Sequence, residues 1–253
     1  MPFFRAGRDV NFGVFRLRLM DESQFIKHRM VTRKSTSRQN ATELAEVETA
    51  PQNWRDAGSR DERTRLIREG LFRAAAEVVG EKGYQDTSIT FITQRAGVAQ
   101  GTFYNHFESR QDILDQLLPA LGKDMLEHVG ACASKGKTLF EREELGFRGF
   151  FSFLRIHPHF FRILNEAPSF APKAYEAHLE LVREGYMHFL RKARGGGEIR
   201  GFSERELEVV TYVLMSARLY LGRYASQDGS NNEIPDWVVK AYCKLIRHGL
   251  SGG

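Results

Sequence analysis

Apolar residues recur every three or four positions from about residue 61 onward, which is the spacing of amphipathic helices. The first helix predicted from this pattern begins near Asp61 and ends at Gly83, because glycine commonly stops a helix. Its apolar stripe consists of Ile67, Leu71, Ala74, Ala75 and Val78. Residues 1–60 keep no sustained period, and residues 32–60 are polar, so we expect disorder through about residue 60.

Two short helices are predicted next, with Gly97 between them. Thr87 is expected to cap the first, because a threonine hydroxyl can accept a hydrogen bond from a free backbone N–H. The inner face of this helix consists of Ile89, Ile92 and Ala96. The second helix starts at about Ala99. A longer helix followed by two short ones around a tight turn is the layout of a helix-turn-helix.

The second short helix separates aromatic from polar side chains. A rotation of about 100° per residue places Phe103 and Phe107 on one face as anchors. The opposite face and its borders consist of Gln100, Gly101, Thr102, Tyr104, Asn105 and His106. Thr102 and Asn105 are the best candidates for base edges, because an asparagine amide can pair with adenine and a threonine methyl can contact thymine. The alternative is a helical hairpin whose polar face has no function.

The run from Leu66 to Leu114 resembles the DNA-binding domain of TetR-family transcriptional repressors. The similarity lies in a helix that ends in Gly-Tyr, a second helix that starts with Thr, the tripeptide Ala-Gly-Val, and the pattern Gly-Thr-hydrophobic-Tyr-x-His-Phe before an acidic, serine-containing turn. Two positions depart from that pattern. Ala99 stands where serine is usual, which removes a hydroxyl that could cap the recognition helix, and Arg110 stands where lysine is usual.

This resemblance implies roles for particular residues. Thr87 and Thr90 would hold backbone phosphates, residues 100–106 would enter the major groove, and Tyr104, His106 and Arg110 would clamp phosphates. The full candidate DNA-binding set is Thr87, Thr90, Gln100, Gly101, Thr102, Tyr104, Asn105, His106 and Arg110. The partner would be double-stranded operator DNA.

The remainder of the chain also has helical periodicity. Ser109 with Asp112 forms a predicted capping box for a fourth helix, which Pro119 should kink or end. Thr138 with Glu141 caps another helix that runs to His157, and residues 167–172 are predicted to form a turn. The fold class is therefore all-α. A disordered basic tail (1–60) precedes a three-helix helix-turn-helix domain (61–110) and a larger helical effector-binding and dimerisation domain (111–253).

Seven phenylalanines lie between residues 140 and 161, a density typical of a large core or of an apolar pocket. A core is the default, and the family resemblance implies a pocket for a small apolar or aromatic effector. The candidate ligand-binding residues are Phe150, Phe151, His157, Phe161, Arg162 and Tyr186. Arg162 either pairs with Glu166 on the surface or binds an acidic group of the ligand.

A metal or catalytic role for His157 and His159 is the alternative for this region. No carboxylate recurs at ligand spacing around these histidines and no nucleophile has an obvious base, so we expect no metal, no cofactor and no enzymatic activity. The two cysteines lack the spacing of a zinc site and are too few for a disulfide framework.

The penultimate helix carries a narrow apolar seam. Ser203 with Glu206 predicts its start, and apolar residues then recur at alternating spacings of three and four. The seam consists of Leu207, Val210, Leu214, Ala217 and Leu221. With a last helix that follows Pro235, this pattern suits a four-helix bundle built from two subunits of a homodimer. Packing within one subunit is the alternative.

Net charge is concentrated at the amino-terminal end. Residues 1–38 hold nine Lys/Arg and three Asp/Glu, a net charge of +6. The whole chain has a net charge of +5, so the rest is close to neutral. Such a tail either adds non-specific attraction to nucleic acid or is simply solvated. No run of about 18 uninterrupted apolar residues occurs, so we expect a cytoplasmic protein without a membrane partner.

The function predicted from the sequence is a ligand-responsive, homodimeric repressor that binds a near-palindromic operator. The first alternative is a helical enzyme or small-molecule carrier that retains a helix-turn-helix. The second is an architectural DNA binder without a ligand, which would show shallow sequence preference and steep salt dependence.

Overall fold

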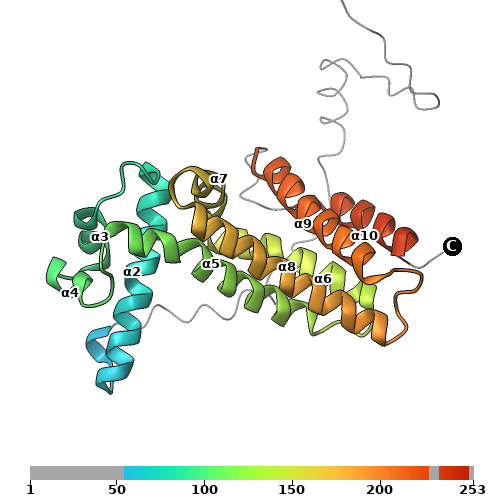
Figure 1. Ribbon diagram of the computed structural model, residues 1–253, viewed down its shortest axis with the longest axis horizontal. Coiled ribbons are helices and arrows are strands. Elements are labelled where there is room, and N and C mark those ends of the chain that lie inside the picture. Colours follow the sequence, from blue (N-terminus) through green and yellow to red (C-terminus); the bar gives the residue numbers. More distant parts are fainter. Residues whose placement is uncertain (1–53, 228–233, 251–253) are drawn as a thin grey trace, which may run out of the picture. The chain divides into compact units, whose positions relative to one another are not determined.

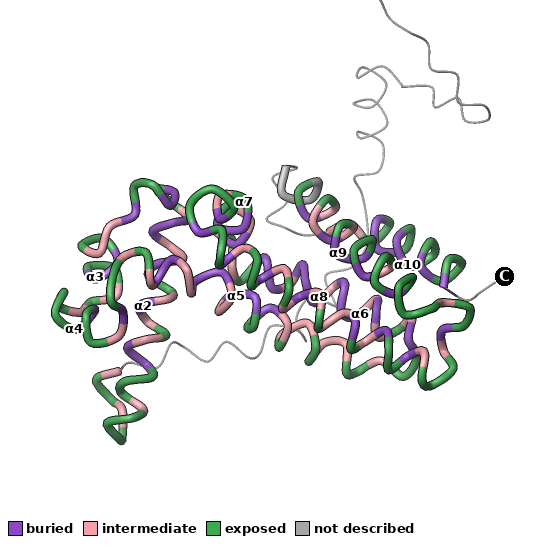
Figure 2. Tube along the Cα trace, in the orientation of Figure 1, coloured by how far each residue is buried: buried purple, intermediate pink, exposed green. Residues whose placement is uncertain are grey.

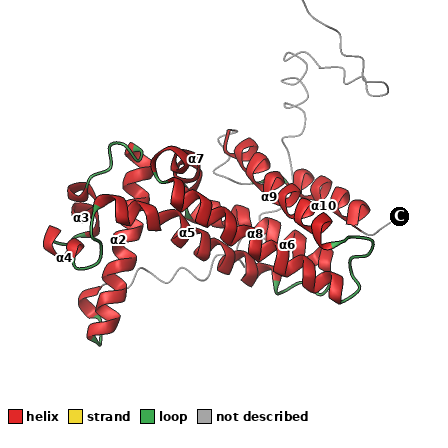
Figure 3. Ribbon diagram, in the orientation of Figure 1, coloured by secondary structure: helices red, strands yellow, loops and turns green. Residues whose placement is uncertain are grey.

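The computed structural model describes residues 54–227 and 234–250, with side chains described up to residue 223 in the first range. Every regular element of these ranges is a helix, and they contain no strand (Figures 1 and 3). The predicted all-α class is confirmed. Most of the predicted disordered tail, residues 1–53, lies outside the described residues.

A three-helix unit comes first along the described chain. It consists of α2 (Arg60–Lys82), α3 (Ile89–Ala96) and α4 (Gln100–Tyr104), preceded by the short 3₁₀ helix η1 (Trp54–Asp56). The predicted stripe of α2 is buried throughout. Gly83 follows α2 with a φ of +88°, a backbone angle that residues other than glycine rarely adopt. The predicted stop is confirmed.

The start of α3 differs from the prediction by one residue. Ser88, not Thr87, caps this helix, and its hydroxyl accepts a hydrogen bond from the N–H of Phe91. Thr87 is buried and its hydroxyl donates to the carbonyl oxygen of Gly83 at 2.7 Å. The cap prediction was wrong because two adjacent hydroxyl residues could serve, and the buried one satisfies the end of the preceding helix. Gly97, at φ +66°, forms the predicted turn.

α5 (Arg110–Ala133) begins as predicted, with the Ser109 hydroxyl accepting from the N–H of Asp112. It does not end at Pro119. The helix continues through the proline because the flanking Leu117, Leu118 and Leu121 are buried against neighbouring helices, and this packing outweighs one missing backbone hydrogen bond.

Five further helices follow. They are α6 (Leu139–Ile156), α7 (Phe160–Phe170), α8 (Pro172–Gly195), α9 (Glu204–Gln227) and α10 (Asp236–Leu250). The capping boxes predicted for α6 and α9 are both present. The predicted turn over residues 167–172 is wrong: α7 reaches Phe170, its last turn closes with an Ala171 N–H···O=C Ala167 bond of 2.8 Å, and α8 begins at Pro172.

α5 packs against α2 of the three-helix unit and runs alongside α6 and α8 (Figure 1). A continuous set of buried apolar residues extends from α2 to α10, and the inward faces of the helices are buried along their length (Figure 2). The described residues lie within one compact unit, residues 52–253. The domain boundary predicted at residue 110 coincides with the start of α5 and remains a prediction.

Candidate DNA-binding surface and effector cavity

α4 is held on the three-helix unit by its aromatic side. Phe103 and Phe107 are fully buried, with their ring centroids 5.5 Å apart, and Phe72 of α2 packs edge-on against Phe107. The predicted polar face points outward: Gln100, Gly101, Tyr104 and Asn105 are exposed, while Thr102 and His106 are half-buried. A five-residue helix is too short to be stable alone, so these two phenylalanines fix the orientation of its polar face.

The turn between α3 and α4 joins two of the predicted site residues. The side-chain amide of Gln100 donates to the hydroxyl of Thr90 at 2.9 Å. Ala99 precedes α4 and offers no side-chain cap, so the first backbone N–H groups of α4 have no hydroxyl partner on that residue. The departure noted at Ala99 is therefore visible as an uncapped helix start.

Three predicted phosphate contacts are not presented as expected. Thr87 is buried, and Arg110 donates through Nη2 to the carbonyl oxygen of Tyr84 at 2.6 Å. Burial, followed by the charge of Arg68, lowers the pKa of His106 below its ordinary value, so its neutral form predominates at neutral pH. The hydrogen bonds of Thr87 and Arg110 stabilise the three-helix unit itself, and the phosphate contacts of all three residues stay a prediction.

Trp54 and Arg55, just before α2, contact this region and were missed from the sequence. Arg55 donates to the carbonyl oxygen of Gly97 at 3.5 Å, and the guanidinium groups of Arg55 and Arg63 lie 4.3 and 4.9 Å from the ring centroid of Trp54. A tryptophan beside arginine in an otherwise polar stretch was the available signal. It was hidden because the whole segment was predicted to be disordered.

An apolar cavity of about 260 Å³ lies among α5, α6, α7, α8 and α9. The predicted Phe150, Phe161 and Tyr186 line it, with Met125, Phe160 and Leu164. Phe151 is instead buried in the core outside this lining, and His157 stacks on Phe153 with ring centroids 4.2 Å apart. Neither residue lines the cavity: Phe151 packs against Phe147 and Phe150 of its own helix, and His157 ends α6 as its C-cap.

Arg162 does not line the cavity either, and it joins two parts of the chain. Its Nη1 donates to the carbonyl oxygens of Gly80 and Glu81, both at 2.9 Å, at the carboxyl end of α2. Its Nε donates to Glu166, whose other carboxylate oxygen accepts from the N–H of Tyr84 at 2.9 Å. α7 therefore holds the end of α2 with one side and lines the cavity with the other.

A buried ion pair beside the cavity was also missed. Nη1 of Arg218 donates to Glu143 at 3.0 Å and to the hydroxyl of Tyr242 at 3.2 Å, and the Tyr242 hydroxyl donates to the same Glu143 oxygen. Arg218 is 6% exposed and Glu143 4%, so this pair is removed from solvent. It joins α9, α6 and α10. Single charged residues in amphipathic helices resemble solvated ones, and only the tertiary contact distinguishes them.

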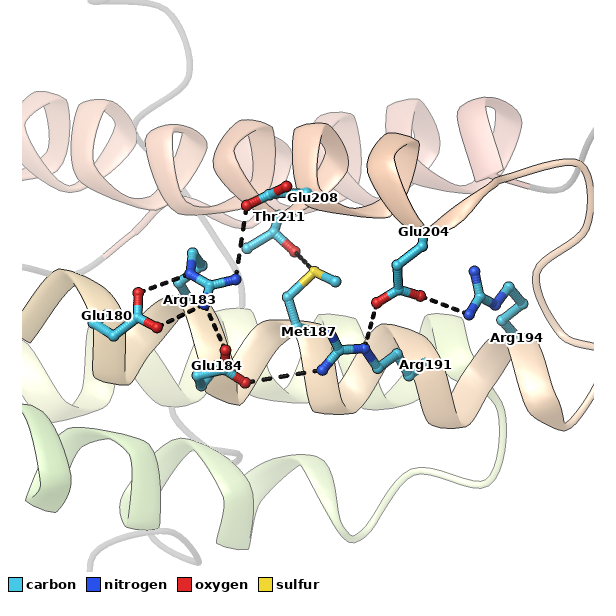
Figure 4. A network of polar contacts seen from close by, with 9 residues as sticks. All are labelled: Glu180, Arg183, Glu184, Met187, Arg191, Arg194, Glu204, Glu208 and Thr211. Atoms are coloured by element: carbon cyan, nitrogen blue, oxygen red, sulfur yellow. Dashed lines mark hydrogen bonds and ion pairs between the residues drawn. The ribbon is translucent and has the colours of Figure 1, made fainter.

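The predicted dimer seam packs within the chain. Leu207 and Leu214 are buried and Val210, Ala217 and Leu221 are half-buried, because α9 lies against α8. Ion pairs flank this contact: Glu204 pairs with Arg191 at 2.6 Å and with Arg194 at 2.7 Å (Figure 4). Leu207 and Leu214 therefore pack within the chain, as the alternative had it, and a subunit interface at the half-buried Val210, Ala217 and Leu221 stays a prediction.

Large apolar side chains are exposed on a different face of α9 and on α10. They are Val209, Tyr212, Val213, Tyr220, Trp237 and Leu245, each more than half exposed. Val213 follows Val209 by four residues and Tyr220 follows Val213 by seven, a spacing that places these three along one side of α9. Large apolar side chains exposed along one side of a helix are typical of an interaction surface.

None of the described helices is long and apolar enough to cross a membrane. Within the described ranges, no three His, Cys, Asp or Glu side chains gather as ligands for a metal ion.

The sequence of the three-helix unit is similar to that of known transcriptional regulators. Residues 71–117 match the family model described as "Bacterial regulatory proteins, tetR family". The chain is 43% identical over 61 residues to the uncharacterized HTH-type transcriptional regulator YvdT of Bacillus subtilis (strain 168), which covers 24% of this chain and 29% of that relative. It is 33% identical over 84 residues to the fatty acid metabolism regulator protein of the same organism, which covers 33% and 43% of the two chains. The matches span less than half of these curated relatives.

The solved structure of the transcriptional regulator FadR from Bacillus subtilis, in complex with stearoyl-CoA, has a similar fold. The TM-score is 0.59 at 21% identity, over 72% of this chain and 98% of that chain. At this identity the likeness concerns the fold alone. The chain therefore matches the tetR family of bacterial regulatory proteins in sequence over residues 71–117, and its fold is similar to that of this solved regulator over 72% of the chain.

Proposed function

We propose that this protein is a homodimeric transcriptional repressor that releases its operator when an acyl-type effector occupies the cavity. The polar face of α4 would enter the major groove, with Thr102 and Asn105 at base edges and Tyr104 at a phosphate. Tyr104 and Asn105 are exposed and Thr102 is half-buried, on a segment that buried aromatic rings hold in place, and this presentation supports the role.

The observation that carries the proposal is that α7 contacts both the cavity and the end of α2. Phe160, Phe161 and Leu164 line the cavity from this helix, while Arg162 and Glu166 of the same helix bind the end of α2 and the N–H of Tyr84. A ligand that favours one placement of α7 would therefore bias the placement of the three-helix unit. A ligand with equal affinity for both placements would shift nothing.

The cavity lining and the relatives support the class of effector. The inner lining is mainly Phe, Leu, Met and Val, which favours a ligand with a hydrocarbon body. FadR of Bacillus subtilis was solved with stearoyl-CoA, and another matched relative is a fatty acid metabolism regulator protein. We take stearoyl-CoA as the first effector to test.

The homodimer is proposed to form through the exposed apolar face of α9 and α10 in place of the seam predicted from the sequence. A two-fold dimer would hold two copies of α4 about one helical turn of DNA apart, so its operator would be a near-palindrome.

Tyr212→Glu tests this interface directly, because it places a charge at the exposed face and leaves the buried seam intact. Sedimentation at micromolar concentration should show a folded monomer for this variant and a dimer for the control Arg155→Glu, whose site is exposed on α6. A dimeric Tyr212→Glu protein would remove α9 from the interface.

The function itself is tested by fluorescence anisotropy with the DNA just upstream of the protein's own coding sequence. We expect tight binding to that DNA, weaker binding to scrambled DNA of equal length, and release on addition of stearoyl-CoA. Equal affinity for both DNAs would favour the architectural binder, and no DNA binding would favour the helical enzyme or carrier.

A further inference from the structure

The cavity has a buried end and an exposed mouth. Met125, Phe150, Phe160 and Leu164 line the inner part and are buried. At the mouth the lining side chains are exposed: Asn165, Pro168, Tyr220 and Arg223. A ligand that enters therefore meets hydrocarbon inside and polar groups only near solvent or at a few buried points.

Two arginines line the cavity, and they differ in what they already bind. Arg218, at 6% exposure, is paired with Glu143 and hydrogen-bonded to Tyr242, and its guanidinium lies 5.3 Å from the Phe147 ring centroid and 5.0 Å from that of Tyr186. Because Glu143 balances its charge, Arg218 provides no net positive charge for a second anion. A buried anion without its own cation is strongly disfavoured.

The remaining side chain in the inner lining that could carry a positive charge is His178, which is buried on α8 against Gly122 of α5. Burial lowers its pKa to about 4, so the imidazole is neutral at neutral pH. No aspartate or glutamate belongs to the described lining. The inner end of the cavity therefore has no uncompensated charge of either sign.

Arg223 is the other arginine, and it is exposed at the mouth. It forms no ion pair with any described residue. The preceding Gly222 lies directly against α7, because a Cβ on that glycine would be 2.4 Å from the Phe161 ring. This close approach brings the carboxyl-terminal part of α9 against α7, where both helices line the cavity.

We propose that the cavity takes an amphipathic anion, whose apolar body lies among Met125, Phe150 and Phe160 and whose charged end binds Arg223 at the mouth. The proposal rests on the cavity being the effector site and adds the ligand class and its orientation. A carboxylate and a phosphate share the chemistry that Arg223 recognises, since guanidinium binds both through charge-assisted hydrogen bonds. A free fatty acid and an acyl thioester of a phosphate-bearing carrier are its two sources.

Calorimetry on the full chain at pH 7.5 tests the orientation with dodecanoate, 1-dodecanol and dodecanoyl-CoA, each below its aggregation concentration. Arg223→Gln should weaken binding of dodecanoate about three- to tenfold and leave 1-dodecanol unchanged, because only the anion loses a partner. Arg205→Gln is the matched control, an exposed arginine near the other end of the same helix that lines no part of the cavity. It should change neither affinity. Unchanged thermal unfolding of both variants confirms that they fold.

Dodecanoyl-CoA separates the two sources. A thioester that binds more tightly than dodecanoate and loses more in Arg223→Gln identifies the phosphates as the recognised group, and the reverse identifies the free carboxylate. Equal losses for dodecanoate and 1-dodecanol in Arg223→Gln, or no loss for either anion, would overturn the orientation. Failure of all three probes to bind would overturn the ligand class. Loss of the proposed function would look different: the probes would bind as expected while operator affinity stayed constant.

Discussion

The three-helix unit and the cavity helices α5–α9 place their polar groups in opposite ways. In the unit, α4 turns its amide, hydroxyl and phenol groups outward and buries only the rings of Phe103 and Phe107. Around the cavity, a complete ion pair of Arg218 and Glu143 is buried and apolar side chains of α9 and α10 are exposed. The first arrangement suits a surface that meets a charged, hydrated partner, and the second suits a ligand and a second subunit.

Arg218→Met should break the buried arrangement most strongly. It leaves the Glu143 carboxylate buried without its cation, so we expect the free energy of unfolding to fall by about 3–5 kcal/mol. Chemical denaturation measures this change. The exposed Arg223→Met should change it by less than about 0.5 kcal/mol.

Adding Glu143→Leu to Arg218→Met removes the unpaired charge and should recover most of the lost stability. A loss below about 1 kcal/mol in the single variant would mean that the pair is not buried as the structure has it.

The pH dependence of stability should reveal the neutral histidine beside the cavity. Burial lowers the pKa of His178 to about 4, whereas the unfolded chain takes up the proton near its ordinary 6.5. The unfolded state therefore binds more protons between these values. The free energy of unfolding should fall as the pH drops from about 6.5 to about 4, by at most about 3 kcal/mol from this residue.

Denaturation at several pH values checks this slope. The free energy of unfolding of His178→Gln should change less with pH over that window than that of wild type. His188→Gln, at an exposed position on the same helix, should show the wild-type slope. His106, His128 and His157 contribute in the same direction, because burial also lowers their pKa values. Equal slopes for wild type and His178→Gln would show that His178 titrates normally.

Substitutions on the outward side of α4 and its C-cap should separate base recognition from phosphate binding. Asn105→Ala should reduce the difference in binding free energy between the preferred and other bases at one operator position by about 1–3 kcal/mol. Tyr104→Ala should weaken binding to all DNA alike. Anisotropy titrations with operator variants measure both effects. Both side chains are exposed, so thermal unfolding should stay unchanged. Operator affinities equal to wild type in both variants would remove α4 as the reading helix.

The sequence predicted the three-helix unit well because its information is local. The stripe of α2, Gly83 after α2, Gly97 after α3 and the two anchor phenylalanines each follow from spacing within one helix or turn. Ser88 in place of Thr87 was the one error in capping, since adjacent hydroxyl residues have nearly equal propensity for that position.

The cavity helices were predicted less well because their decisive contacts join residues far apart in the sequence. The seam of α9 has the spacing of a helix interface, but periodicity does not say whether α8 or a second subunit covers it. Arg162 was assigned to a ligand or to Glu166. It binds Glu166 and also two carbonyl oxygens of α2, more than 80 residues earlier.

The central claim is that cavity and operator are coupled through α7. Calorimetry of stearoyl-CoA binding, with and without saturating operator DNA, tests it most directly, because coupling between two ligands is reciprocal. A coupling of about 1–3 kcal/mol predicts that operator weakens stearoyl-CoA binding by about 5- to 150-fold, with a smaller factor in Arg162→Gln. Identical stearoyl-CoA affinity in the two titrations would contradict the switch and leave a DNA binder that no cavity ligand controls.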